Sequence, residues 1–477
     1  MTSISSYRQL LAYATVAIFL VFIFFYGTAE SFRGPSNVSS TQGAHEKIDL
    51  GNPTLHPDFS NYFELRKLTI DEFPLDDPYK RVIVVGDLHG MNKPFHKLLD
   101  HLDYVPSKDH LIHVGDIVSK GSHKGSLAIL NYMTSRNITG VRGNHDQKVV
   151  EWRAWIEWIS SKRGGKEWIS SLEKRWYDYE VSDEDSKLKD SASWLETFNT
   201  STDKKWLSQI PKGWILFSDH YKLARDMSND AYNYLLGLPL RLYVPSAHTF
   251  IVHAGILPSN PLYAMDNKHK QPLARIPVFP KHPTEDKTNS VEGLRQIQEI
   301  GIITEIPQNT DPWVTLNIRS VIDDTASKKS KGGTAWSKIW NKHMDSCVGF
   351  RKRLGNRMSP PSFIDDEDDG HDNGTQEDDD DATVDTNSKK IKLPCYPSTT
   401  IYGHAAGRGL DVKRWSIGLD SGCVYEERLS ALVLGGTTNG HDRVSYKEED
   451  PNAEKNQDRW IPFGDKGRAN IVSVKCQ

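Results

Sequence analysis

The chain is poor in cysteine, has no excess of positive charge and contains one long hydrophobic run. Only four cysteines occur in 477 residues and none form a CxxC pair, which argues against a zinc ribbon. The formal net charge is -4, so bulk electrostatics give no reason to expect a specific nucleic-acid partner. Hydrophobic residues make up 37% and charged residues 26%, which indicates a polar globular protein rather than a disordered one.

The cysteines leave two interpretations open. Cys347 and Cys395 flank an acidic segment and could pair in an oxidising compartment. Alternatively, all four cysteines, including Cys423 and Cys476, are free thiols.

The hydrophobic run predicts a membrane anchor. Residues 10–27 lie in an uncharged stretch between Arg8 and Glu30, which is about the length of a transmembrane helix. A signal peptide cut near "GTA" is the alternative, but the run is longer than the usual core of about 7–15 residues. We therefore predict a transmembrane signal anchor with a short cytosolic tail, residues 1–9, and a lumenal domain.

N-x-S/T triplets agree with a lumenal glycoprotein without establishing one. They begin at Asn37, Asn137, Asn199 and Asn373.

Short β-branched runs alternate with helical patterns from "RVIVVGDLHG" onwards, which predicts βαβ units and an α/β fold. The segments "TTIY", "RWSIG" and "RLSALVLGG" predict antiparallel strands near the end of this domain. The expected organisation is a stalk (28–74), a catalytic domain (75–445) with a tryptophan-rich helical insertion (151–245) and a disordered acidic loop (355–392), and a C-terminal tail (446–477).

Polar residues stand where successive strands are predicted to end, in the order "GDLHG", "GDIVSKG", "GNHD", "HAG" and "YGH". Open α/β sheets place ligands at these carboxyl ends. Mixed carboxylate, amide and imidazole ligands suit divalent ions such as Zn, Mn or Fe. The candidate metal ligands are Asp87, His89, Asp116, Asn144, His253 and His404.

This series of motifs resembles the calcineurin-like metallophosphoesterases. The resemblance implies a β-sandwich flanked by helices, and two divalent metal ions, with Zn favoured and Mn, Co, Fe or Mg as alternatives. It implies that Asp87, His89 and His404 hold one metal and that Asn144 and His253 complete the other. Asp116 would bridge the two, and a water activated by both metals would attack the phosphorus.

His145 is expected, from the same resemblance, to donate a proton to the leaving group, oriented by Asp116 or a nearby carboxylate. Asp116 and His145 are therefore the predicted catalytic residues.

Lys120 indicates the branch of the family. Protein Ser/Thr phosphatases have "GDxVDRG" where this chain has Ser119 and Lys120, and a lysine lacks the bidentate fork of arginine. "GDIVSKG" and "YGHAAGRGL" resemble the ApaH-like phosphatases, although Ala405 replaces the usual acid of "GHDA". The N-terminal hydrophobic segment, with "LNIRS" (316–320) and "GGTAWSKIWN" (332–341), resembles a fungal subgroup of that branch, which includes vacuolar zinc-dependent endopolyphosphatases.

Four cations are candidate phosphate contacts: Lys120, Arg142, Arg319 and Arg408. Arg319 could instead pair with Asp323 or Asp324, and Arg408 could point to solvent.

The predicted function is metal-dependent hydrolysis of phosphoanhydride bonds, by cleavage inside inorganic polyphosphate chains, with a vacuolar, membrane-anchored location. Protein Ser/Thr phosphatase activity, or hydrolysis of dinucleoside polyphosphates or capped RNA, is the alternative. A non-catalytic scaffold is a third hypothesis, which the intact ligand set disfavours.

Overall fold

The computed structural model describes residues 56–181, 191–198, 200–279, 290–350, 391–436 and 459–477. The chain separates into the units Met1–Leu55 and His56–Gln477, and only the second is described. No helix within the described ranges is long and apolar enough to cross a membrane. The predicted anchor, three of the glycosylation triplets and residues 355–390 of the acidic loop lie outside those ranges.

Two six-stranded sheets form the centre of this unit. The first has the order β1 (Phe63–Lys67), β5 (Pro239–Val244), β6 (Thr249–Val252), β10 (Thr399–Tyr402), β12 (Ser416–Gly418) and β11 (Asp411–Lys413). The second has the order β14 (Arg459–Phe463), β15 (Gly467–Lys475), β13 (Arg428–Gly435), β2 (Arg81–Val85), β3 (Asp109–His113) and β4 (Thr139–Gly140).

The alternation of side chains along β2 shows how the layers pack. Val82 and Val84 join the apolar cluster that also contains Leu242 of the first sheet. Their neighbours Ile83 and Val85 join the cluster formed by the helices on the other face. Because successive strand residues point to opposite faces, β2 is buried on both sides. The predicted sandwich flanked by helices is confirmed.

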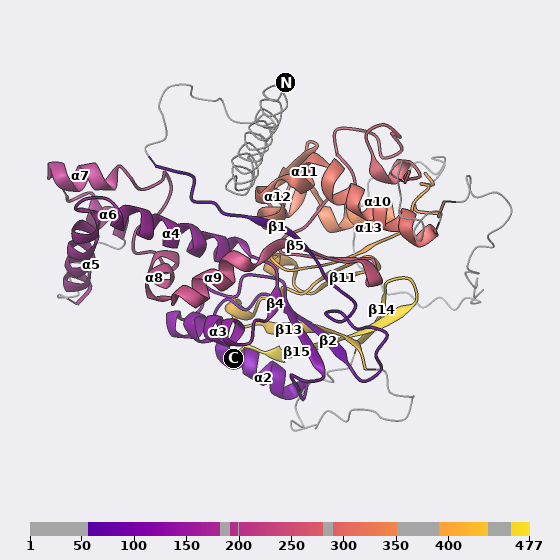
Figure 1. Ribbon diagram of the computed structural model, residues 1–477, viewed down its shortest axis with the longest axis horizontal. Coiled ribbons are helices and arrows are strands. Elements are labelled where there is room, and N and C mark those ends of the chain that lie inside the picture. Colours follow the sequence, from indigo (N-terminus) through magenta and orange to yellow (C-terminus); the bar gives the residue numbers. More distant parts are fainter. Residues whose placement is uncertain (1–55, 182–190, 199, 280–289, 351–390, 437–458) are drawn as a thin grey trace, which may run out of the picture. The chain divides into compact units, whose positions relative to one another are not determined.

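Helices cover the outer faces of both sheets. One apolar cluster joins the second sheet to the helices α2 (Asn92–His101), α3 (His123–Ser135), α4 (Asn144–Ser160), α5 (Gly165–Val181), α6 (Ser191–Leu195), α7 (Ser201–Leu207), α8 (Asp219–Asp226) and α9 (Asn229–Gly237). The first sheet packs against the group α10 (Val291–Glu305), α11 (Pro307–Thr310), α12 (Pro312–Asn317) and α13 (Trp336–Met344). In Figure 1, α4–α9 gather on one side and α10–α13 on the other.

The tryptophan-rich segment is helical and folds onto its own side chains. Trp152, Trp155, Trp168 and Trp206 are buried in the same apolar cluster as Val85. Burial of the indole rings explains the aromatic spacing.

The predicted domain boundaries need correction at both ends. Part of the expected stalk is ordered, because β1 pairs in parallel with β5 and Phe73 is fully buried. The expected C-terminal tail contains β15, which lies between β13 and β14 in the second sheet. Alternate residues of β15 face opposite layers, with Ile471 between the sheets and Val472 toward the helices.

The expected antiparallel grouping of the late strands is wrong in part. β10 and β12 pair in parallel, and β13 belongs to the other sheet. A small third sheet adds β7 (Ser320–Ile322) between β8 (Thr325–Ser327) and β9 (Thr334–Ala335).

All four cysteines form disulfides. Cys347 pairs with Cys395, which was one of the two interpretations, and Cys423 pairs with Cys476, which was not foreseen. The second bond ties the turn before β13 to the end of β15.

Candidate metal centre and active site

The predicted ligands come together because both sheets end at the same place. Asp87 follows β2 and Asp116 follows β3 in the second sheet, whereas His253 follows β6 and His404 follows β10 in the first. All four side chains are buried, with 0 to 6% of their surface exposed. Asn144 begins α4 and is half-buried. The structure thus brings the predicted ligands to one end of the sandwich.

Two groups of three ligands share one carboxylate. Ligand atoms of Asp87, His89 and Asp116 lie within 4.8 Å of one another, and so do those of Asp116, His253 and His404. Asp116 is therefore placed to bridge two cations. The geometry differs from the sequence-based assignment of His404, which groups with His253 rather than with Asp87 and His89.

His253 and Asn144 present acceptor atoms to the same point. His253 Nδ1 lies 2.8 Å from the carbonyl oxygen of Val114, so Nδ1 must carry the proton. Burial lowers the pKa of His253 to about 4, which leaves Nε2 with a lone pair at neutral pH. That atom lies 3.1 Å from Asn144 Oδ1 and 3.5 Å from Asp116 Oδ1. Converging acceptors of this kind fit a cation.

His404 is held in a similar way. Its Nε2 lies 3.2 Å from the carbonyl oxygen of Asn317, which leaves Nδ1 free to bind a metal. Its backbone N–H donates to both carboxylate oxygens of Asp87, at 3.1 and 3.0 Å. One ligand therefore orients another across the two sheets.

The charges of the cluster also fit bound cations. Burial, with repulsion from Asp420 and Asp116, raises the pKa of Asp87 well above its ordinary value. Burial likewise raises the pKa of Asp116 to about 7 and lowers the pKa of His89 to about 3. In the absence of a cation, burial disfavours the ionised form of these carboxylates, and the neighbouring imidazoles are neutral. Divalent ions would offset the negative charge, and carboxylate and imidazole ligands suit them.

Strained backbone marks the same loops. Five residues there have positive φ although none is glycine: His89 (44°), Asp116 (48°), Ser119 (75°), Lys120 (65°) and His404 (67°). Each such conformation costs about 1–3 kcal/mol and is retained mainly at functional sites.

Two glycines let the loops approach closely. A Cβ atom on Gly143 would lie 2.1 Å from Asp116 Oδ1, and one on Gly403 would lie 2.0 Å from Asp87 Oδ1. Any larger residue there would displace a carboxylate of the predicted ligands, which we call the metal cluster (Asp87, His89, Asp116, Asn144, His253 and His404).

His145 is held by its backbone and by its ring. The backbone N–H donates to Asp116 Oδ1 at 2.9 Å. The ring's Nδ1 lies 2.8 Å from Nε2 of His220, at the start of α8. A second imidazole, and not the expected carboxylate, therefore orients the His145 ring directly. Asp146 instead accepts from the backbone N–H groups of Ile117 and Val118, and so fixes the neighbouring loop.

A cavity of about 340 Å³ opens over the metal cluster and is lined by two of the four predicted cations, Lys120 and Arg319. Lys120 Nζ lies 3.3 Å from His89 Nε2. The Arg319 guanidinium donates to the carbonyl oxygens of Lys328 and His404, at 3.1 and 3.0 Å. These backbone partners replace the aspartates that the sequence offered as alternatives, and they hold the guanidinium at the edge of the metal cluster.

The other two predicted cations do not line this cavity. Arg142 is fully buried and donates to Asn61 O, to Gln147 Oε1 at 2.8 Å and to Leu236 O at 2.6 Å. Its prediction as a substrate contact is wrong, because every one of these partners is structural. Arg408 is half-buried and donates to the carbonyl oxygen of Arg319, so it supports Arg319 rather than facing the cavity.

Several lining residues were not foreseen: Asp420, Tyr425, Glu427 and Ser330. Asp420 carried a usable signal, because it follows β12 as the metal ligands follow their strands. Burial raises its pKa, and its charge acts on both Asp87 and Asp116. His220 carried no such signal, since it lies in the helical insertion.

Residues 80–249 match the family model described as calcineurin-like phosphoesterase. This segment of the chain is similar to the calcineurin-like phosphoesterases. The match includes Asp87, Asp116 and His145 but ends before His253 and His404. The structure adds those two imidazoles to the same site.

Curated relatives cover two kinds of phosphatase. The symmetrical bis(5'-nucleosyl)-tetraphosphatase of Haemophilus ducreyi is 46% identical over 65 residues, which cover 13% of this chain and 23% of that protein. Serine/threonine-protein phosphatase 1 of Salmonella typhimurium is 33% identical over 94 residues, which cover 20% of this chain and 43% of that protein. This chain therefore spans less than half the length of either relative.

Among solved structures, a candidate diadenosine tetraphosphatase matches this chain with 20% sequence identity and a TM-score of 0.38. The match covers 80% of this chain and 96% of that protein.

Proposed function

We propose that this domain is a metal-dependent hydrolase of phosphoanhydride bonds that cleaves within inorganic polyphosphate. The supporting observation is the distribution of positive charge at the cavity above the metal cluster. Lys120 and Arg319 line the cavity itself. These two side chains can contact only the phosphates nearest the metal site, so binding of a long polyanion needs further cations along the chain.

A basic loop, residues 328–331, would supply these cations. Ser330 lines the cavity, and Lys328, Lys329 and Lys331 are all exposed. The loop is fixed from beneath, because Arg319 donates to Lys328 O at 3.1 Å and Ser320 Oγ donates to Lys329 O at 2.7 Å. Positively charged side chains thus extend from the proposed metal site to the surface. This arrangement favours binding of a chain of phosphates over binding of a single phosphoryl group.

The division of labour follows from the positions of the side chains. When bound, two divalent cations would lower the pKa of a water molecule and neutralise charge on the phosphoryl oxygens. Lys120 would hold a phosphate oxygen as a point charge, without the fork of an arginine. His145 would donate from Nε2 to the leaving oxygen and stabilise the charge that develops there.

Hydrolysis of dinucleoside polyphosphates is the second candidate. Tyr425 lines the cavity and is 61% exposed, so its ring is available to stack on a base. The relative from Haemophilus ducreyi is named for this kind of substrate. Both candidates require cleavage of the same type of bond.

A substrate panel separates these proposals. The purified domain is chelated, reloaded with Zn, Mn, Co or Mg, and incubated with long-chain polyphosphate, diadenosine tetraphosphate and a phosphopeptide. We expect metal-dependent shortening of polyphosphate on a gel. Cleavage of the phosphopeptide alone would contradict the proposal.

The basic loop can be tested separately. Replacement of Lys328, Lys329 and Lys331 by serine should raise KM for long chains far more than KM for tripolyphosphate. The same change at the exposed Lys93 and Lys97 of α2 should leave both KM values unchanged.

We also propose that the domain works in an oxidising lumen, with a vacuolar membrane location. Two disulfides support an oxidising compartment. Asn137 is exposed just after α3, so a glycan there would meet no steric barrier from burial. Glycosidase sensitivity of the native protein would test this, and an unglycosylated, cytosol-exposed domain would refute it.

A further inference from the structure

The helical insertion sends one side chain to the ring of His145. His220, in the first turn of α8, places its Nε2 2.8 Å from Nδ1 of His145. The two ring planes are also nearly parallel, with centroids 5.0 Å apart and an interplanar angle of 19°. These residues are 75 positions apart in the chain, so the contact depends on how the insertion folds back.

The hydrogen bonds around Ser119 decide which ring carries the shared proton. Ser119 Oγ lies 2.6 Å from Asp219 Oδ2, and it uses its single proton there because an ionised carboxylate can only accept. Ser119 Oγ also lies 3.3 Å from His220 Nε2, and it can only accept from that atom. His220 Nε2 therefore carries a proton and donates toward both Ser119 and His145.

This direction of donation fixes the tautomer of His145. With Nδ1 accepting from His220, the proton of the neutral His145 ring is on Nε2. In that form Nε2–H can donate a hydrogen bond to the leaving oxygen and stabilise the negative charge that develops there, while the proton stays on the ring. Asp219 completes the arrangement, because it also accepts from the backbone N–H of Lys120 at 2.9 Å.

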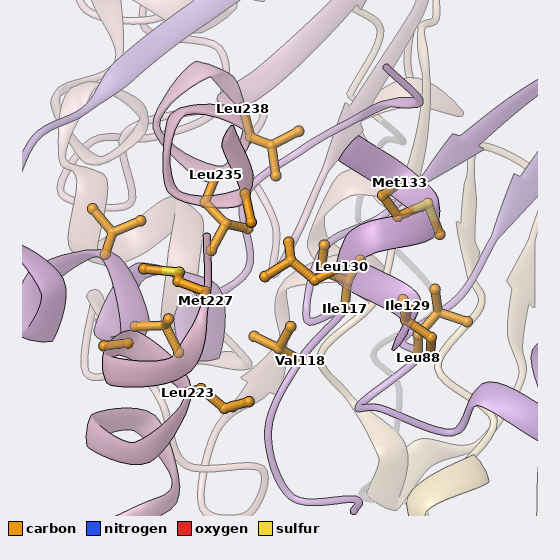
Figure 2. Packing of buried hydrophobic residues seen from close by; sticks show 14 of the residues in the cluster. Leu88, Ile117, Val118, Ile129, Leu130, Met133, Leu223, Met227, Leu235 and Leu238 are labelled. Atoms are coloured by element: carbon orange, nitrogen blue, oxygen red, sulfur yellow. The ribbon is translucent and has the colours of Figure 1, made fainter. Parts of the chain in front are cut away.

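Packing holds α8 firmly enough for this role. Figure 2 shows Ile117 and Val118, which follow Asp116, lying among Leu130 of α3 and Leu223 and Met227 from the region of α8. Phe217, just before α8, has a positive φ of 61° and stacks on Trp176 at 5.2 Å. Because its surroundings hold Phe217 in this strained conformation, the backbone at the start of α8 is fixed in place.

We propose that His220, supported by Ser119 and Asp219, is a positioning residue that holds His145 in the tautomer whose Nε2–H donates a hydrogen bond to the leaving oxygen. The inference rests on the proposed function. Protein phosphatases with "GDxVDRG" have an aspartate where this chain has Ser119, and here a carboxylate reaches that point from Asp219 in the insertion.

The test compares His220→Ala, His220→Gln and His123→Ala. Glutamine retains a donor near the position of Nε2, whereas alanine has none. His123 is the matched control, because it contacts α8 through Asp226 at 2.8 Å but is partly exposed. Turnover, KM, bound metal and thermal unfolding are measured for each variant, with substrates whose leaving groups differ in acidity.

We expect His220→Ala to lower kcat about 10–100-fold, less than loss of the His145 ring itself, with KM and metal content unchanged. The loss should be greatest for the least acidic leaving group. His220→Gln should recover most of the activity, and His123→Ala should match the wild type. Equal losses for all leaving groups, or a loss of metal instead of turnover, would overturn the inference.

Nitrogen NMR of the imidazoles provides a readout that does not depend on the proposed activity. The wild-type spectrum should show His145 protonated on Nε2, and His220→Ala should give a mixture of tautomers. A wild-type ring protonated on Nδ1 would overturn the inference. If the wild type hydrolyses no phosphoanhydride but shows the expected tautomer, the proposed function fails and the inference about the ring stands.

Discussion

The backbone N–H of His404 donates to both carboxylate oxygens of Asp87, although the two residues are 317 positions apart. Asp87 belongs to the second sheet and His404 to the first, so this contact joins the two sheets at the metal cluster. Asp87 therefore lies at one proposed metal position and contacts a ligand of the other.

Asp87→Asn should remove one equivalent of bound metal and lower turnover at least about 100-fold, because an amide lacks the charge that binds a cation. The free energy of unfolding of the metal-free protein should not fall, because burial already opposes ionisation of Asp87. Elemental analysis after reloading, together with denaturant unfolding, checks both statements. Asp100→Asn, an exposed change on α2, is the control and should behave as the wild type.

Arg142→Ala should destabilise the domain without changing substrate affinity. The change leaves one buried acceptor, Gln147 Oε1, and two partly buried carbonyl oxygens without their donor, and the expected loss is about 1–3 kcal/mol in the free energy of unfolding. Denaturant unfolding measures the loss, and KM should stay constant. Arg136→Ala, which removes a guanidinium stacked on Tyr132, should cost about 1 kcal/mol or less. A raised KM for Arg142→Ala at unchanged stability would restore Arg142 as a substrate contact.

Lys120 should matter for substrate rather than for folding. Lys120→Met should lower kcat/KM for polyphosphate about 10–100-fold, because it removes a charge that faces the cavity. Lys120→Arg keeps the charge and should lose less. Lys124→Met on α3 is exposed and should have no effect. Unchanged kinetics for Lys120→Met would remove Lys120 from the site.

Asp203 should make the helical insertion sensitive to acid. Burial raises its pKa, but hydrogen bonds from Arg175, Thr200 and Trp168 outweigh burial and hold the pKa below its ordinary value. The unfolded state then binds more protons, so this stabilisation is present above about pH 4 and is lost as the pH falls through the folded pKa. Asp203→Asn should flatten the dependence of unfolding free energy on pH in that range. Asp178→Asn, an exposed change on α5, should keep the wild-type slope, and equal slopes for both variants would contradict the assignment.

The motifs predicted the metal cluster because each ligand follows a strand, and parallel strands deliver their ends to one place. Arg142 was misassigned because its position beside "GNHD" does not reveal that its side chain turns inward. His220 could not be found from sequence, since its contact with His145 depends on tertiary packing of α8.

The fold was predictable in class but not at its edges. The β-branched run "RVIVV" identified a buried strand, which is β2. The strands β14 and β15 lie within the segment that was predicted to be a tail, and residues 437–458 separate them from β13 in sequence. The pairing of β10, β12 and β13 was predicted incorrectly, because local periodicity identifies a strand but does not show which strand it pairs with.

Phosphorus NMR of long-chain polyphosphate during turnover tests the central claim most directly. Internal, terminal and free phosphate give separate signals, so the position of cleavage is visible as it happens. We predict that terminal signals rise early, with little free phosphate, in the metal-loaded wild type and not in Asp116→Asn. An unchanged spectrum, or release of free phosphate from chain ends only, would contradict cleavage within the chain by this metal site.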